Sequence, residues 1–181
     1  MSLRPTRLPF SAGIMVSAGL ASQFAPRVGV RPVAAIGFLL TAAGLALFTR
    51  VPVDGSYVTD VLPPIILASL GMGAVFMPLT LIATTGLEDA DQGLASGLFN
   101  TSQQVGGALG LAILSTIATN RTAAAVGAPA HNLVVGFHWA FAAGAVAMII
   151  ALGVMVALLG SHHVAKIEEQ AVSGEPVIVG A

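Results

Sequence analysis

The chain has 181 residues, of which 56% are hydrophobic and only 8% are charged, and its formal net charge is −1. Soluble domains carry about 25% charged residues, so this composition cannot supply the polar surface that a soluble fold of this length needs. The charge balance excludes a basic surface for nucleic acid, and the absence of cysteine excludes disulfides and thiolate metal sites. The sequence therefore predicts an integral membrane protein whose main partner is the lipid bilayer.

Long stretches without Asp, Glu, Lys or Arg follow one another along the chain. A bilayer core about 30 Å thick takes about 20 helical residues, so each of the first four stretches fits one helix. The last stretch is longer, but Gly127-Ala128-Pro129 within it predicts a loop that leaves room for one span only. We therefore predict an all-α membrane protein with five transmembrane helices in one domain over residues 1–160. The predicted spans are residues 8–25, 33–50, 63–84, 93–118 and 134–159.

The connections between the predicted spans are short and polar. The first two spans are joined by a tight basic turn, Ala25-Pro26-Arg27-Val28-Gly29-Val30-Arg31-Pro32. The positive charges divide almost evenly between the two sides of the membrane, so the composition does not orient the protein. Residues 161–181 form a polar tail with little apolar surface to bury, and we predict that this tail is disordered.

The third predicted span carries a proline in its interior. Pro78 should kink this helix, and Gly71 and Gly73 should soften it just before the kink. Methionine and phenylalanine near the kink offer adaptable apolar contacts, which suit the moving wall of a cavity. A static kink packed against neighbouring helices is an equally good interpretation. The cavity candidates in this span are Met72, Phe76 and Met77.

The fourth predicted span is rich in glycine at four-residue spacing. Glycines four residues apart share a helix face, and they let the backbone of another helix approach closely. We therefore predict a helix-packing role for these glycines. They are Gly93, Gly97, Gly106, Gly107 and Gly110.

The same span carries three amide side chains, Asn100, Gln103 and Gln104. Amides in hydrocarbon need hydrogen-bond partners, so this face should point into protein or into a wet cavity. One interpretation is that the amides hold a helix bundle together through hydrogen bonds. The other is that they line a substrate path, and the residues alone leave both interpretations open.

No residue pattern of an enzyme stands out in the chain. There is no nucleophile–base pair, no phosphate-binding glycine loop and no paired acid, and no Asp or Glu lies deep in any predicted span. His138, beside Trp139 at the start of the last span, is explained more simply as a membrane-interface residue. We predict no catalytic residue, no cofactor and no metal ion.

Two segments resemble the fourteen-span drug:proton antiporters of the major facilitator superfamily. Gly97-Leu-Phe-Asn-Thr-Ser-Gln-Gln-Val-Gly-Gly-Ala-Leu-Gly-Leu-Ala112 resembles the penultimate helix of that family, although many relatives place Arg at the position of Gln103. The loop residues Arg27, Gly29 and Arg31 match the conserved cytoplasmic loop Gly-x-Leu-Ala-Asp-Arg-x-Gly-Arg-Arg. The same loop departs from the pattern at Ser22, Phe24 and Pro26, which replace its first Gly, its Leu and its Asp.

The resemblance implies a place for each predicted span. If the loop at Arg27 joins helices two and three of a transporter half, the five spans are helices two to six of the C-terminal half. This register implies a multi-pass protein of the plasma membrane with its N-terminus outside and its C-terminal tail in the cytoplasm. It also places the third span against the central cavity of the family, where a small apolar or amphipathic substrate would bind.

The resemblance implies a function and an obstacle to it. Such transporters rock two six-helix halves around a central site, and this chain lacks the N-terminal half. We therefore expect the C-terminal fragment of a proton-coupled multidrug efflux transporter, from a truncated gene product or a misplaced start, that does not transport alone. The alternative is a non-transporting membrane subunit or assembly module that packs through its glycine-rich helix faces.

Overall fold

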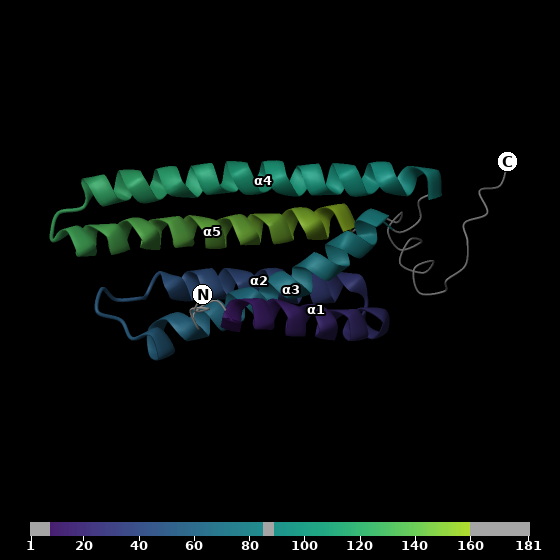
Figure 1. Cartoon of the computed structure of the whole chain (residues 1–181), viewed down its shortest axis with the longest axis horizontal. Helices are drawn as coiled ribbons and strands as arrows, with labels where there is room; N and C mark the ends of the chain where they lie inside the picture. Colours follow the sequence, from purple (N-terminus) through teal and green to yellow (C-terminus); the bar gives the residue numbers. More distant parts are fainter. Residues whose placement is uncertain (1–7, 85–88, 160–181) are drawn as a thin grey trace, which may run out of the picture.

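The computed structural model describes residues 8–84 and 89–159 of the chain. Five α-helices run in alternating directions (Figure 1), which confirms the all-α prediction. The helices are α1 (Leu8–Val28), α2 (Val30–Phe48), α3 (Leu62–Thr84), α4 (Asp89–Ala124) and α5 (Pro129–Leu159). One π-helical turn, η1 (Tyr57–Val61), precedes α3, and no strand occurs in the two described ranges. The predicted polar tail, residues 161–181, lies outside the described residues.

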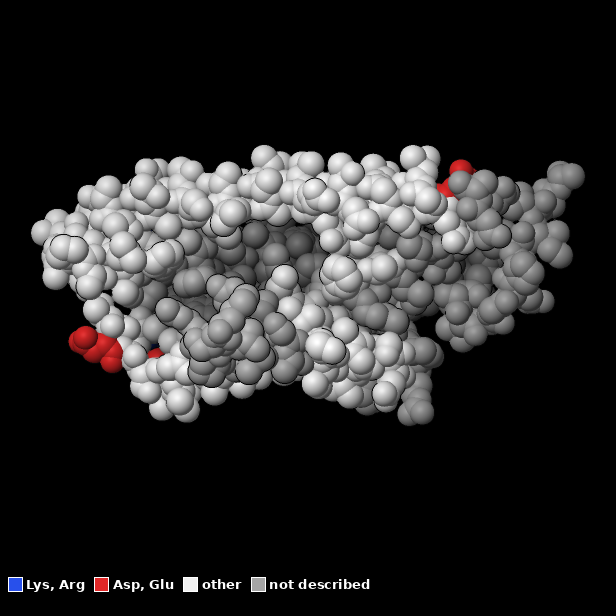
Figure 2. All heavy atoms as spheres, viewed as in Figure 1, with Lys and Arg blue, Asp and Glu red and all other residues white. Residues whose placement is uncertain are grey.

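Three of the helical stretches are long and apolar enough to cross a membrane: Val30–Phe48, Tyr57–Thr80 and Pro129–Leu158. The face shown in Figure 2 agrees with a lipid environment, because its acidic atoms lie only near the two ends of the molecule. The polar residues in α4 lower the hydropathy of that helix. That α1 and α4 also cross the membrane stays a prediction.

Helix α3 packs closely against α2 through glycine. A Cβ atom added to Gly37 of α2 would lie 2.8 Å from Val75 Cγ2 and 2.9 Å from the carbonyl oxygen of Gly71. One added to Gly44 would lie 2.6 Å from the backbone nitrogen of Ala68. Contacts this short leave no room for any side chain, so the two backbones touch only because these positions are glycine.

Helix α3 uses its other side against α1. A Cβ atom added to Gly73 would lie 2.6 Å from the carbonyl oxygen of Ile14 and 2.8 Å from Ser17 Cβ. The buried Ser17 hydroxyl also donates a hydrogen bond to the carbonyl oxygen of Leu70. Gly71 and Gly73, which the sequence indicated as points of softness, are therefore close-packing residues. Pro78 lies inside α3 and is fully buried.

Helix α5 rests on α2 and α3 with an apolar core between them. Ala34, Phe38 and Met155 are buried together in this core. At the far end of α2, the ring of Phe48 stacks on Phe141 with 4.8 Å between centroids. His138 Nε2 also lies 2.9 Å from the carbonyl oxygen of Val51, so α5 is hydrogen-bonded to the loop that follows α2.

Helix α4 contacts the rest of the molecule mainly through α5. Near the α4–α5 loop, a Cβ atom added to Gly136 would lie 2.5 Å from the carbonyl oxygen of Ala118 and 3.1 Å from Thr122 Cβ. Residues 91–94 and 100–109 of α4 are exposed throughout. Figure 2 shows the molecule hollowed below α4, between this helix and the lower helices. Helix α4 thus packs most closely against α5 near the α4–α5 loop and is largely exposed over residues 91–109.

Candidate functional site

The amide side chains of α4 lie on the side of the helix that faces α5. Asn100 lies five helical turns of 3.6 residues before Ala118, and Gln104 lies five turns before Thr122. Residues a whole number of turns apart lie on the same side of a helix, so the two amides share the side that carries Ala118 and Thr122. Ala118 and Thr122 pack against Gly136 of α5. Asn100 and Gln104 are exposed, as is Gln103. The amide face therefore continues the α5 contact surface into a part of α4 whose side chains are exposed.

The opposing part of α5 is open as well. Val154 follows Gly136 by five turns, so it lies on the same line of α5, and 52% of its surface is exposed. Val154 also lines an apolar pocket of about 470 Å³ between α2, α3 and α5. The other lining residues include Phe38, Leu79, Ile150, Ala151 and Met155. An amide-bearing helix and an apolar groove thus border the same open side of the bundle.

The cavity candidates of α3 lie at the surface of this chain. Met72 and Phe76 are 52% and 55% exposed, and they are one helical turn apart on one face. They line none of the three pockets described in this section. The side chain of Met77 lies outside the described residues. Their role at a substrate cavity stays a prediction.

The glycines predicted to pack in α4 have no close neighbour within the described chain. A Cβ atom added to any of them would meet nothing within 4 Å. This holds for Gly93, Gly97, Gly106, Gly107 and Gly110. Their packing role stays a prediction, and it requires a partner that is not among the described helices.

The loop motif forms the sharp turn between α1 and α2. Gly29 has φ 94° and ψ 153°, a backbone conformation that residues other than glycine rarely adopt. The Nε atom of Arg31 is buried without a hydrogen-bond partner. The side chain of Arg27 lies outside the described residues. The backbone geometry of the turn therefore explains why position 29 is glycine. The function of Arg27 and Arg31 stays a prediction.

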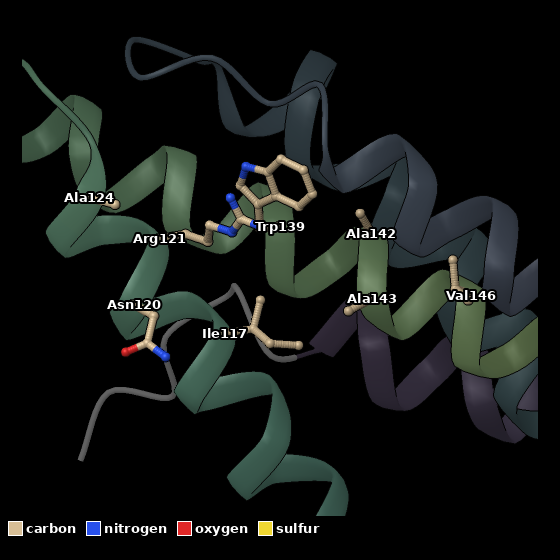
Figure 3. Close-up of a pocket in the computed structure, with 8 residues that line it drawn as sticks. All are labelled: Ile117, Asn120, Arg121, Ala124, Trp139, Ala142, Ala143 and Val146. Carbon is tan, nitrogen blue, oxygen red and sulfur yellow. The ribbon is translucent and has the colours of Figure 1, made fainter.

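Sequence reasoning missed a second pocket, between the C-terminal part of α4 and α5. The Arg121 guanidinium carbon lies 4.0 Å from the centroid of the Trp139 ring. The two side chains point toward one another at one end of a pocket of about 760 Å³ (Figure 3). Ile117, Ala143 and Val146 line the apolar remainder. The sequence signals were a charge at the end of an apolar span and the single tryptophan of the chain.

A smaller pocket of about 490 Å³ also lies between α4 and α5, and Thr119, Leu133 and Phe137 are among its lining residues. Within the described ranges, no group of three or more His, Asp or Glu side chains could hold a metal ion. The candidate binding surfaces in the described residues are therefore apolar pockets, with the α4 amides and Arg121 as neighbouring polar groups. Such surfaces suit the binding of small molecules or lipids.

The chain is similar to bacterial resistance and export proteins, which confirms the predicted resemblance. It is 42% identical over 120 residues to the puromycin resistance protein pur8 of Streptomyces alboniger, a match that covers 65% of this chain and 24% of that protein. It is 38% identical over 104 residues to the cephamycin export protein CmcT of Amycolatopsis lactamdurans, covering 58% of this chain and 21% of that protein.

A third relative carries the superfamily in its name. The chain is 28% identical over 118 residues to the MFS-type transporter YhcA of Bacillus subtilis, which covers 64% of this chain and 21% of that protein. No family model matches the chain. The matched region thus spans about a fifth to a quarter of the length of these relatives. None of the three is named as an enzyme.

Proposed function

We propose that this chain supplies the C-terminal part of a membrane transporter that exports small apolar or amphipathic molecules in exchange for protons. The observation that carries the proposal is the identity of 42% and 38% to proteins named for puromycin resistance and cephamycin export. The chain itself acts as a non-enzymatic helical unit in the plasma membrane. Its N-terminus is outside and its C-terminal tail is in the cytoplasm.

The open side of the bundle supports a role in substrate binding. Amphipathic molecules need apolar contacts together with a few polar groups that fix their orientation. The amides of Asn100 and Gln104 supply hydrogen-bond donors and acceptors on α4. The groove around Val154 supplies apolar contacts on α5. A substrate held between the two would satisfy amides that otherwise have no place in hydrocarbon.

The proposal also requires the N-terminal half of a transporter. Alternating access requires two helical bundles that rock around a site between them. A proton-coupled exporter also needs a carboxylate that binds and releases protons within the membrane. The predicted spans contain no Asp or Glu deep in the bilayer, so the other half would supply that carboxylate. This chain alone should therefore not lower the drug content of cells.

A hybrid transporter tests the proposal. The matching segment of a full-length puromycin resistance relative is replaced by the segment of this chain, and puromycin accumulation is measured in cells that lack other exporters. We expect the hybrid to lower accumulation, and the triple variant Asn100→Leu, Gln103→Leu, Gln104→Leu to abolish this effect at equal abundance in the membrane. Ser102→Leu is the matched control, because Ser102 lies on the opposite face of α4.

The hybrid experiment also has outcomes that contradict the proposal. A hybrid that reaches the membrane intact without lowering accumulation would remove the transport role of this segment. Equal loss of export in the triple variant and in Ser102→Leu would remove the specific role of the amide face. Export by the unmodified chain expressed alone would contradict the need for a second half.

The open glycine face favours one alternative, a non-transporting subunit that assembles with other membrane helices. Gly93 and Gly97 have open space around them, so a partner helix could pack closely there. The chain lacks cysteine, so Gly97→Cys introduces a unique crosslinking site. Disulfide-linked dimers of Gly97→Cys in membranes, but not of a Ser102→Cys control, would support this alternative. A chain that stays monomeric and is rapidly degraded would contradict it.

A further inference from the structure

The pocket at Arg121 combines residue types that are typical of the boundary of the bilayer core. Helix α5 has no charged residue over its whole length, and the 20 residues from Trp139 to Leu158 alone are about 30 Å long, enough to cross the hydrocarbon core. The hydrogen bond from His138 to Val51 places the end of α2 at the same level. Tryptophan concentrates at membrane–water interfaces. We therefore expect Trp139, and with it Arg121, where hydrocarbon meets lipid headgroups.

The charge of Arg121 has no counter-charge in the described part of the chain. Its guanidinium carbon lies 4.0 Å from the centroid of the Trp139 ring, and no described carboxylate forms an ion pair with it. A guanidinium presents five N–H donors in a planar fork, and a cation–π contact with a ring provides no oxygen acceptor for them. These N–H groups match the oxygen atoms of a phosphate in geometry and in charge.

The rest of the pocket is apolar and runs from this charge toward the middle of the membrane. In Figure 3, Ile117 on α4 and Ala143 and Val146 on α5 continue the pocket away from Arg121. Val146 follows Trp139 by two turns, so the apolar wall extends about 10 Å below the interface. The pocket thus has one cationic end at headgroup level and one apolar end at acyl-chain level.

We propose that this pocket binds one anionic phospholipid. The Arg121 guanidinium binds the lipid phosphate, and one acyl chain lies along Ile117, Ala143 and Val146. The charge favours an anionic headgroup over a zwitterionic one, because a zwitterionic lipid carries its own cation beside the phosphate. The site is separate from the amide face of α4, and the proposal needs membrane insertion but no transport activity.

The single tryptophan of the chain makes the proposal directly measurable. The full chain is reconstituted into phosphatidylcholine vesicles that contain a small fraction of either brominated phosphatidylglycerol or brominated phosphatidylcholine. Bromine quenches only a tryptophan in contact with the lipid, so quenching reports which lipid occupies the pocket. We expect brominated phosphatidylglycerol to be enriched about fivefold at Trp139, as one arginine near the membrane surface predicts.

Three variants separate the pocket from a general surface charge. Arg121→Gln should reduce the enrichment to about onefold, and Arg121→Lys should retain part of it. Arg50→Gln removes an exposed cation at the same level beyond the end of α2, and it should leave the enrichment unchanged. Circular dichroism shows whether each variant keeps its helices, so that a folding defect is distinguished from loss of binding.

Several outcomes would overturn the proposal. Equal quenching by the two brominated lipids in the unmodified protein would show that the pocket has no preference for an anionic lipid. An equal drop in Arg50→Gln and Arg121→Gln would assign the preference to general surface charge. Loss of the enrichment on adding inorganic phosphate would identify a free-anion site. Quenching that rises on dilution of the protein in the membrane would identify a second copy of the chain as the occupant.

Discussion

The helices α1, α2 and α3 and the open part of α4, residues 91–109, use glycine in opposite ways. In the first region, glycines such as Gly37, Gly44 and Gly73 lie directly against the backbone of a neighbouring helix. In the second region, glycines at similar spacing have nothing within 4 Å. Glycine spacing therefore indicates that a helix can be approached closely. The packing of the whole bundle decides whether a partner is there.

The contrast has a physical basis in the membrane. Apolar side chains gain little by leaving lipid for protein, so helices associate through close packing and hydrogen bonds. The α1–α3 region has both, since Ser17 donates a hydrogen bond from α1 to α3 beside the glycine contacts. The open part of α4 has the exposed amides Asn100 and Gln104, and its glycines have no atom within 4 Å of an added Cβ. Its residue types are those of a helix–helix interface, but no described helix packs against them.

The largest expected effect comes from a methyl group added inside the packed region. In Gly71→Ala, the new Cβ would lie 2.6 Å from the carbonyl oxygen of Gly37, so the two helices must move apart. We expect the free energy of unfolding to fall by about 3 kcal/mol. The measurement is unfolding by SDS in mixed micelles, followed by far-UV circular dichroism.

The matched control for Gly71→Ala is Gly97→Ala in the open part of α4. Its new methyl group meets open space, and alanine favours helix over glycine by up to about 1 kcal/mol. We expect this variant to be as stable as the original chain or slightly more stable. If both variants lose the same stability, the contrast between the two regions is wrong.

A smaller effect is expected at the turn that starts the packed region. Gly29 has φ 94° and ψ 153°, so Gly29→Ala places a Cβ atom where the backbone conformation disfavours it. We expect a loss of about 2 kcal/mol in the same unfolding measurement. Gly19→Ala serves as control, because Gly19 lies within α1 with nothing near it. An unchanged stability of Gly29→Ala would mean that the turn relaxes without cost.

The link between α5 and the end of α2 should contribute less. His138→Leu removes the hydrogen bond to the carbonyl oxygen of Val51 and should cost about 1 kcal/mol. His131→Leu is the control, because His131 is exposed at the start of α5. Equal stability of the two variants would show that this hydrogen bond does not hold α5 against α2.

The smallest effect is expected in the open part of α4. Asn100→Leu replaces an exposed amide, so the stability of the chain alone should change by less than about 0.5 kcal/mol. The same substitution belongs to the variant that should abolish export by the hybrid. A loss of more than about 1 kcal/mol in the chain alone would assign Asn100 to bundle stability and contradict its place at a substrate surface.

Much of the fold could be predicted from local chemistry. The spacing of charges and the loop at Pro129 predicted five helices, and the five observed helices overlap the five predicted ranges. The predicted ends differ by a few residues, because α4 and α5 begin before their apolar stretches begin. Helix ends follow backbone hydrogen bonding, whereas the predicted bounds followed hydrophobicity.

The candidate sites were harder to predict, because they depend on residues far apart in the sequence. Gly71 and Gly73 suggested flexibility near Pro78, yet each lies against another helix. The sequence did not indicate that Arg121 and Trp139 are in contact, because a loop and more than one helical turn separate them. Their cation–π contact lies beside Gly136, where α5 packs closely against α4.

The sequence by itself determined that this protein is helical and belongs in a membrane. Both conclusions depend on composition and on the length of uncharged stretches, which each segment carries independently of the others. Only the tertiary structure decided which glycines make contacts, which face of α4 stays open, and that Arg121 shares a pocket with Trp139. The reason is physical: close packing joins two surfaces, and one segment of sequence specifies only one of them.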